Sequence, residues 1–281
     1  MRMQLFRNII VLLGAVIALW GVTACSTHSS FSDPVDEGCK IPSFGNDGEY
    51  RVFSLRAMTY NVHNCKGTDG VVDYKRVADV ITEHNLDIVA LQELDSMTTR
   101  YPGQDVLKNL ADHTGMYPIF GAAINSRGGK YGVGVLTKKK ALSHYRIPLL
   151  CSSEPRVVLV VEMDDFYFFC THFSLLAEYR EKAVDIIVNE AKKLKKPVIL
   201  AGDLNATRDQ LSMQTLAKHF YIFEKLSLRN TFPSGAPTKE IDFICLYKGR
   251  AAEAVITEHR VLNAPVISDH LPVIIDLTIC E

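Results

Sequence analysis

The chain has 281 residues, of which 47% are hydrophobic, 22% charged and 9% aromatic, and its formal net charge is −1. This is the composition of an ordinary globular protein, and it excludes a disordered chain, a collagen, a coiled coil and a protein with several membrane spans. The lack of a basic excess disfavours an extended nucleic-acid groove, which needs a positively charged face.

Residues 1–24 have the pattern of a secretory signal peptide. Two arginines near the start give a positive n-region, and an apolar run follows over residues 9–20. About 12 residues are too few to span a hydrocarbon layer of about 30 Å, but they suit a signal h-region. Small residues then precede Cys25 in a stretch, Val-Thr-Ala-Cys, that resembles a bacterial lipobox. The resemblance implies cleavage before Cys25 and lipidation of its thiol. An ordinary secretory signal with a chance cysteine is the alternative.

The stretch over residues 25–50, which begins with the lipidated cysteine, is expected to be a tether. It is rich in Ser, Asp, Gly and Pro and shows neither helical nor strand periodicity. A flexible chain of that length reaches about 25–30 Å. The prediction is therefore a monomeric globular domain over residues 51–281, exported to a bacterial cell envelope and held at the membrane by a lipid anchor.

The remaining chain mixes strands and helices without an internal linker. Apolar runs predict strands at residues 52–62, 86–91, 117–123, 132–137, 157–162, 166–171, 198–201, 241–246, 254–257 and 271–279. Helices are predicted after the capping residue Asp73, over residues 105–113 and over residues 178–194. The strands come in two batches, each with its own helices, which favours an α/β fold with two sheets packed face to face and helices outside.

Polar side chains recur at the ends of these apolar runs. A carboxylate at the edge of a buried strand costs several kcal/mol unless a partner neutralises it. A hard cation would supply that partner, and oxygen ligands suit Mg²⁺, Mn²⁺ or Ca²⁺ better than Zn²⁺. Taken singly, each residue has a plainer interpretation, such as a strand-end cap, a core histidine or a turn. The set comprises Asn61, Gln92, Glu93, His172, Asp203, Asn205, Asp242, Asp269 and His270.

In this order, the motifs resemble the endonuclease/exonuclease/phosphatase superfamily, which has the deoxyribonuclease-I-like fold. They are Tyr60-Asn61, Gln92-Glu93, Thr171-His172, Gly202-Asp203-Leu204-Asn205, Ile241-Asp242 and Ser268-Asp269-His270. The resemblance covers about residues 53–279. It implies a four-layer α/β sandwich of two packed mixed β-sheets flanked by helices, with the site at the top between the sheets. It also implies metal-assisted cleavage of phosphate esters.

The resemblance implies a role for each polar residue at the metal. Glu93 is the first candidate ligand for Mg²⁺ (or Mn²⁺ or Ca²⁺), and Asp269 is a second carboxylate. Asn61 would contact either the metal or a phosphate oxygen. A divalent cation at this position would offset the negative charge of the phosphate and of the transition state.

The remaining motif residues would act on the substrate and on the attacking water. Asp203 would orient or deprotonate the water, and Asn205 would hold a phosphate oxygen. His270 would transfer a proton or place positive charge beside the phosphate, and Asp242 would fix its tautomer. His172 would donate a further hydrogen bond to the phosphate. Which carboxylate serves as the base stays open at this stage.

Three further positions carry weaker signals. Arg156 could bind phosphate through its guanidinium, although a surface salt bridge is equally consistent with the sequence. Arg180, at the start of the long helix, would brace the loop after His172. Many family members have an acidic residue two positions after this histidine, whereas Ser174 stands there in this chain, which puts a finer subfamily assignment in doubt.

The function expected from these residues is hydrolysis of a phosphodiester or phosphomonoester at the cell envelope. Nucleic acid, a phospholipid or a small phosphodiester are the candidate substrates. A catalytically inactive binding lipoprotein of the same fold is the alternative, and an adhesion module is a third possibility, supported only by the serine-rich tether.

Overall fold

The structure is a computed structural model that describes residues 51–149, 151–250 and 253–280. The predicted signal peptide, Cys25 and the tether lie outside these described residues. The chain divides into two units, residues 1–44 and residues 45–281, and the second unit contains every described residue. None of the helices in the described part is both long enough and apolar enough to cross a membrane.

The first sheet contains six strands in the order β11-β12-β1-β2-β4-β3. β1 lies in its middle, parallel to β2 and antiparallel to β12. The remaining pairs of this sheet are antiparallel. Its strands are β1 (Val52–Asn61), β2 (Ile88–Ser96), β3 (Tyr117–Ser126), β4 (Gly129–Thr137), β11 (Glu253–Val261) and β12 (Val273–Cys280).

The second sheet also contains six strands, in the order β5-β6-β7-β8-β10-β9. Its centre repeats the arrangement of the first sheet, because β7 is parallel to β8 and β10 is antiparallel to β8. Its strands are β5 (Ser143–Leu149), β6 (Arg156–Glu162), β7 (Tyr167–His172), β8 (Val198–Asp203), β9 (Phe220–Ile222) and β10 (Asp242–Tyr247).

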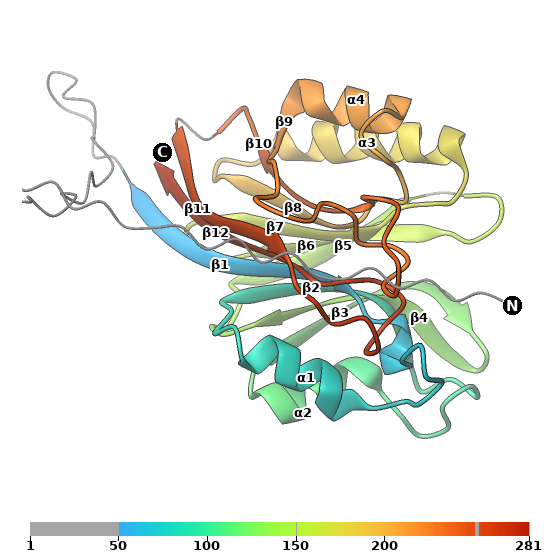
Figure 1. Ribbon diagram of the computed structural model, residues 1–281. Coiled ribbons are helices and arrows are strands. Elements are labelled where there is room, and N and C mark those ends of the chain that lie inside the picture. The colour runs from blue at the N-terminus through green and yellow to red at the C-terminus, as the bar shows by residue number, and fades with distance from the viewer. Residues whose placement is uncertain (1–50, 150, 251–252, 281) are drawn as a thin grey trace, which may run out of the picture. The chain divides into compact units, whose positions relative to one another are not determined.

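Helices cover the outer face of each sheet, so the domain has four layers (Figure 1). α1 (Tyr74–Thr82) and α2 (Val106–Thr114) lie on the first sheet, and α3 (Ala177–Ala191) and α4 (Leu211–His219) lie on the second. Three apolar cores fill the spaces between these layers: one between the sheets and one beneath each helix pair. The predicted two-sheet α/β sandwich is therefore confirmed.

The sequence-based elements differ from the observed ones mainly at exposed positions. β5 was not predicted, because it is an edge strand with mostly exposed side chains and a proline, and such a strand shows no apolar alternation. α4 was not predicted either, since only Ser212, Met213 and Leu216 of its nine residues are buried. The short strand β9 was also missed. The long helix runs over Ala177–Ala191 rather than residues 178–194.

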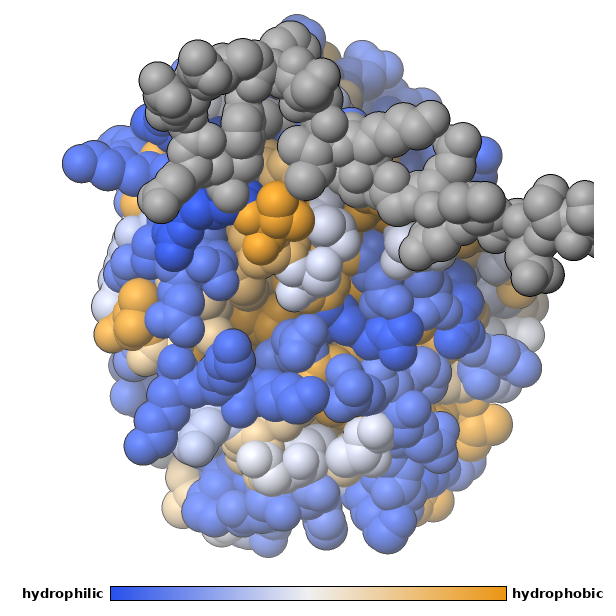
Figure 2. All heavy atoms as spheres, turned by 90° about the vertical axis from the view of Figure 1, so that its left-hand side faces the viewer, coloured by the Kyte–Doolittle hydropathy of each residue, from blue (hydrophilic) through white to orange (hydrophobic). Residues whose placement is uncertain are grey.

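The end of the sandwich at which β1 starts lies away from the polar residues predicted from the strand ends. Figure 2 shows this end, where hydrophilic side chains predominate and apolar ones gather in small areas. A pocket between the start of β1, the end of β4 and the β6–β7 turn holds about 100 Å³, and its walls include Phe53, Lys138 and Phe166. The opposite end, where β1 finishes, carries the polar residues that were predicted from the strand ends.

Candidate active site

The strand topology brings the predicted polar residues to one end of the sandwich. Parallel strands end at the same edge of a sheet, so Asn61 of β1 lies beside Gln92 of β2, and His172 of β7 lies beside Asp203 of β8. An antiparallel neighbour begins where its partner ends, and this places Asp242 at the start of β10 directly opposite Asp203. By the same rule, the segment that leads into β12 passes the end of β1, where the hydroxyl of Ser268 donates a 2.7 Å hydrogen bond to the carbonyl of Asn61.

A pocket of about 510 Å³ opens between these strand ends. Asn61 and Asp242 are completely buried and hydrogen-bonded to residues of its wall. The pocket is lined by Glu93, Arg156, His172, Leu175, Arg180, Asp203, Asn205, Thr207, Gln210, Phe232, Lys239, Ile241, Asp269 and His270.

Asp203 is the centre of the hydrogen-bond network at the pocket wall. Its Oδ2 accepts a 3.1 Å hydrogen bond from Asn61 Nδ2 and lies 3.3 Å from His172 Nε2 and 3.7 Å from His270 Nε2. Its Oδ1 accepts a hydrogen bond from the backbone N–H of Asn205. Burial alone would raise the pKa of Asp203, but the neighbouring His172 and His270 outweigh it, through the hydrogen bond from His172 and the charge of His270, and keep the pKa below its usual range. Asp203 is therefore a carboxylate at neutral pH.

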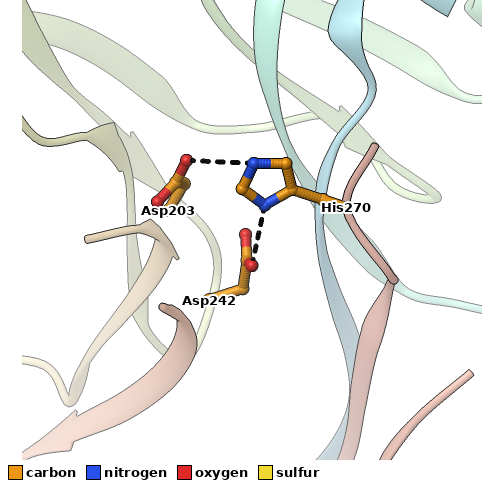
Figure 3. Close-up of side chains that lie close together, drawn as sticks. All are labelled: Asp203, Asp242 and His270. Carbon is orange, nitrogen blue, oxygen red and sulfur yellow. Dashed lines mark hydrogen bonds and ion pairs between the residues drawn. The ribbon is translucent and has the colours of Figure 1, made fainter. Parts of the chain in front are cut away.

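His270 lies between two carboxylates. Its Nδ1 donates a 2.9 Å hydrogen bond to Asp242 Oδ2, while its Nε2 faces Asp203, as Figure 3 shows. Burial would lower the pKa of His270, but Asp242 and Asp203 raise it to about 10. The ring of Phe232 packs against the imidazole with a centroid distance of 4.8 Å. His270 is thus held in one orientation as a cation.

Glu93 reaches the pocket through an irregularity in β2. The pairing of β2 with β4 shifts register between Leu91 and Leu94, and Glu93 has a left-handed backbone with φ of 60°. Such a bulge turns a side chain away from the regular alternation of the strand, at a conformational cost that a functional site can justify. The carboxylate of Glu93 accepts a 3.0 Å hydrogen bond from Asn61 Nδ2.

Two carboxylates of the pocket wall suit a hard cation. Glu93 and Asp269 both line the pocket, and Asn61 turns its Nδ2 toward Glu93 while its Oδ1 accepts a hydrogen bond from the backbone N–H of His63. Carboxylate and amide oxygens are the ligands that Mg²⁺, Mn²⁺ and Ca²⁺ prefer. A second group, Asp203, Asp242 and His270, has ligand atoms within 4.8 Å of one another. Its histidine bears a proton on the nitrogen facing Asp242 and is cationic, which makes it a poor metal ligand.

Asn205 follows β8 in a left-handed conformation with φ of 47°. Its Nδ2 donates a 3.0 Å hydrogen bond to the carbonyl of Phe173, which ties the loop after β8 to the loop after β7. One amide hydrogen of Asn205 remains for a ligand, because the carbonyl of Phe173 occupies only one of the two.

The two arginines singled out from the sequence are both buried at the pocket. Arg156 pairs with Glu154 at 2.5 Å, and its Nη1 lies 3.3 Å from Nδ1 of His172. The expected salt bridge is present, but the arginine itself is only 9% exposed. Arg180 donates hydrogen bonds to the carbonyls of Ser174 and Leu175, so it braces the loop after His172 as predicted.

Several wall residues were not anticipated from the sequence. Thr207, Gln210, Phe232 and Lys239 come from loops that carry no strand-end signal. Gln210 accepts a 3.0 Å hydrogen bond from Arg180 Nη2, and the apolar ring of Phe232 covers His270. An aromatic residue before a proline in a polar loop would have been the one available signal for Phe232.

A buried ionic cluster supports Asp242 from behind. The side chain of Lys225 is fully buried and donates hydrogen bonds to Glu240 Oε1, at 2.6 Å, and to the backbone carbonyl of Asp242. Arg208 binds the same carboxylate of Glu240 through two nitrogens. Since Glu240 lies two residues before Asp242, this cluster fixes the start of β10 and with it the position of the Asp242 carboxylate.

Comparisons with known proteins agree with this architecture. The model of the Endonuclease/Exonuclease/phosphatase family matches residues 58–270. An endonuclease/exonuclease/phosphatase from Beutenbergia cavernae DSM 12333 is similar, with a TM-score of 0.67 and 23% identity over 80% of this chain and 72% of that chain. A mannosyl-6-phosphatase from Bacteroides thetaiotaomicron VPI-5482 has a TM-score of 0.65 and 18% identity, over 79% and 99% of the two chains. Humanized D. rerio TDP2 has a TM-score of 0.63 and 17% identity, over 80% and 98%. No curated protein gave a significant match.

Proposed function

Because this chain belongs to the endonuclease/exonuclease/phosphatase family, we propose that it hydrolyses phosphate esters with the help of a divalent cation. The observation that carries the proposal is the surroundings of Asp203. One buried carboxylate lies between the imidazoles of His172 and His270 and accepts a hydrogen bond from Asn61, on the wall of one pocket. An aspartate with a purely structural role would not require two imidazoles beside its carboxylate.

Asp203 is the group that we assign to the attacking water. It is ionised at neutral pH, since its two histidine neighbours keep its pKa below the usual range, and it borders the pocket. A carboxylate of this kind orients a water molecule by accepting a hydrogen bond and takes its proton as the nucleophile attacks phosphorus. Asn205, on the same loop, would hold a non-bridging phosphate oxygen through its free amide hydrogen.

His270 is the group that we assign to the developing negative charge. With a pKa of about 10 it is cationic at neutral pH, and Asp242 keeps its Nε2 directed at the pocket. A cation fixed in a buried site stabilises the charge on the phosphate oxygens of the transition state, because the low dielectric strengthens the interaction.

Glu93, Asp269 and Asn61 would hold the cation, with Mg²⁺ as the expected ion and Mn²⁺ or Ca²⁺ as substitutes. A bound divalent ion would supply neutralisation of the phosphate charge, which otherwise repels an anionic nucleophile. The support for this assignment is the pair of carboxylates, Glu93 and Asp269, on the pocket wall, with the side chain of Asn61 hydrogen-bonded to Glu93.

The substrate that we propose is a phosphate ester met outside the cytoplasm, by a protein anchored in the bacterial cell envelope through Cys25. A nucleic acid, a phospholipid and a small phosphodiester are the candidates. The mannosyl-6-phosphatase among the structural neighbours adds a sugar phosphate to the substrates worth testing. A screen of the purified protein against these four classes would rank them.

Metal removal is the test of the proposed function. Treatment with EDTA should abolish hydrolysis of a generic phosphodiester such as bis(p-nitrophenyl) phosphate, and added Mg²⁺ or Mn²⁺ should restore it. The reason is that repulsion between the anionic phosphate and the nucleophile is no longer offset. Activity that EDTA leaves unchanged would refute the metal assignment. Absence of hydrolysis on every substrate class with every divalent ion would favour the inactive binding lipoprotein.

A further inference from the structure

The imidazole of His172 is held at both nitrogens by groups of different chemistry. Nδ1 lies 3.3 Å from Nη1 of Arg156, and Nε2 lies 3.3 Å from Oδ2 of Asp203. The residue is 5% exposed, so water has little access to either nitrogen. A guanidinium can only donate hydrogen bonds and stays protonated at any pH at which a protein is folded. Nδ1 must therefore be the acceptor and carry no proton.

The proton of the ring is consequently on Nε2, which donates to Asp203. The tautomer follows from the partners alone, because a carboxylate accepts and a guanidinium donates. His270, on the same carboxylate, has the opposite arrangement: its Nδ1 faces the carboxylate of Asp242 and must donate. His270 is therefore protonated on both ring nitrogens, whereas His172 is protonated on Nε2 alone.

Arg156 is held firmly enough by its neighbours to keep His172 in the Nε2–H tautomer. It begins β6, where it pairs with Leu149 of β5. Its Nη1 carries two hydrogens, and Glu154 Oε1 at 2.5 Å accounts for one, which leaves the other for His172. A guanidinium bound in this way cannot rotate away from His172 without breaking its ion pair.

We propose that Arg156 is a positioning residue that holds His172 as the uncharged Nε2–H tautomer. This inference rests on the proposed phosphoesterase function for its consequence, although not for its geometry. A neutral His172 donates its single N–H, on Nε2, to Asp203 and leaves that carboxylate able to accept a proton from water. A protonated His172 would form a full ion pair with Asp203 and weaken it as a base.

Removing the guanidinium should leave Nδ1 of His172 without a donor, so that a proton can occupy it. The net field at the ring then depends on the charged and titratable groups that remain around the pocket. These groups are Glu154 before β6, Tyr131 of β4, Asp203 of β8, Arg180 of α3, Glu93 of β2, Lys239 before β10, and Asp269 and His270 before β12.

The direct test is a nitrogen-15 NMR spectrum of the histidine side chains in the full-length protein, with His172 assigned by a His172→Gln variant. In the unsubstituted protein we expect Nδ1 of His172 to be unprotonated and Nε2 protonated. In Arg156→Met we expect a proton to appear on Nδ1, because no donor then occupies that nitrogen. A proton on Nδ1 in the unsubstituted protein, or an unchanged His172 in Arg156→Met, would overturn the proposal.

The kinetic test separates tautomer control from a merely structural role. We expect Arg156→Met to lose roughly 10–100-fold in kcat. Arg156→Lys, another pure donor, should recover part of this loss. Arg146→Met, at an exposed arginine of β5 that donates to the carbonyl of Ala122, is the control and should retain normal kcat. Equal losses in both Arg156 variants would overturn the proposal.

The two tests also separate this proposal from the proposed function. If the unsubstituted protein hydrolyses none of the substrates, the phosphoesterase function fails, but the NMR experiment still decides the state of His172. If Arg156→Met does not fold, the spectrum of the unsubstituted protein and that of Arg156→Lys still report the tautomer.

Discussion

Replacing Asp203 by Asn is expected to lower kcat for phosphodiester hydrolysis by roughly three orders of magnitude, in the middle of the range for loss of a general base. The amide keeps the size of the carboxylate but cannot take a proton from water. It also removes the negative charge that both imidazoles face, since Asp203 Oδ2 lies 3.3 Å from His172 and 3.7 Å from His270. Steady-state kinetics with a saturating divalent ion measure the loss.

A matched control separates this effect from general damage. Asp79→Asn makes the same chemical change on the surface of α1, where the carboxylate pairs with Lys75 and is 48% exposed. We expect normal kcat in that variant and native near-ultraviolet circular dichroism in both. Turnover of Asp203→Asn within a factor of ten of the unsubstituted protein would show that another group activates the water.

The assembly of the site could be predicted from sequence because strand ends carry topological information. Asn61, His172 and Asp203 each follow an apolar run, and parallel neighbours end at one edge. The capping preference of aspartate also predicted the start of α1. Asp73 accepts a hydrogen bond from the backbone N–H of Arg76, and α1 begins at the next residue, as expected.

What could not be predicted depends on contacts between distant segments. The bulge that turns Glu93 into the pocket is a property of the β2–β4 pair, and periodicity along β2 gives no sign of it. The burial of Arg156 likewise follows from packing between β6, His172 and Glu154, so the sequence alone left a surface salt bridge open. Pocket walls contributed by loops, such as Lys239, lack any periodic signal.

The buried cluster behind Asp242 leads to the largest expected change in stability. Glu240→Ala removes the carboxylate that neutralises both Lys225 and Arg208. The ammonium of Lys225 has a side-chain exposure of 0% and cannot move to water. Breaking a buried ion pair in this way costs about 3–5 kcal/mol of unfolding free energy. Urea denaturation monitored by circular dichroism measures the loss.

The pH dependence of this loss identifies its cause. Burial lowers the pKa of Lys225, while Glu240 opposes that shift. Without Glu240 the folded-state pKa falls further below the ordinary value of about 10.4. At pH values between this lowered pKa and the ordinary one, the unfolded chain binds more protons than the folded chain. The free energy of unfolding of the variant therefore rises with pH. The loss in Glu240→Ala should therefore be larger at pH 6 than at pH 9.

Glu224→Ala is the control, because that carboxylate also pairs with Arg208 but is 60% exposed. An exposed pair contributes about 0–1 kcal/mol, so this variant should unfold close to the unsubstituted protein at both pH values. Similar losses in the two variants, or a loss in Glu240→Ala that does not change with pH, would mean that Lys225 is not the charge left unpaired. If the loss of unfolding free energy in Glu240→Ala has the expected pH dependence, kcat of this variant should also be lower than that of the unsubstituted protein. The reason is that Lys225 and Glu240 together hold the start of β10, where Asp242 orients His270.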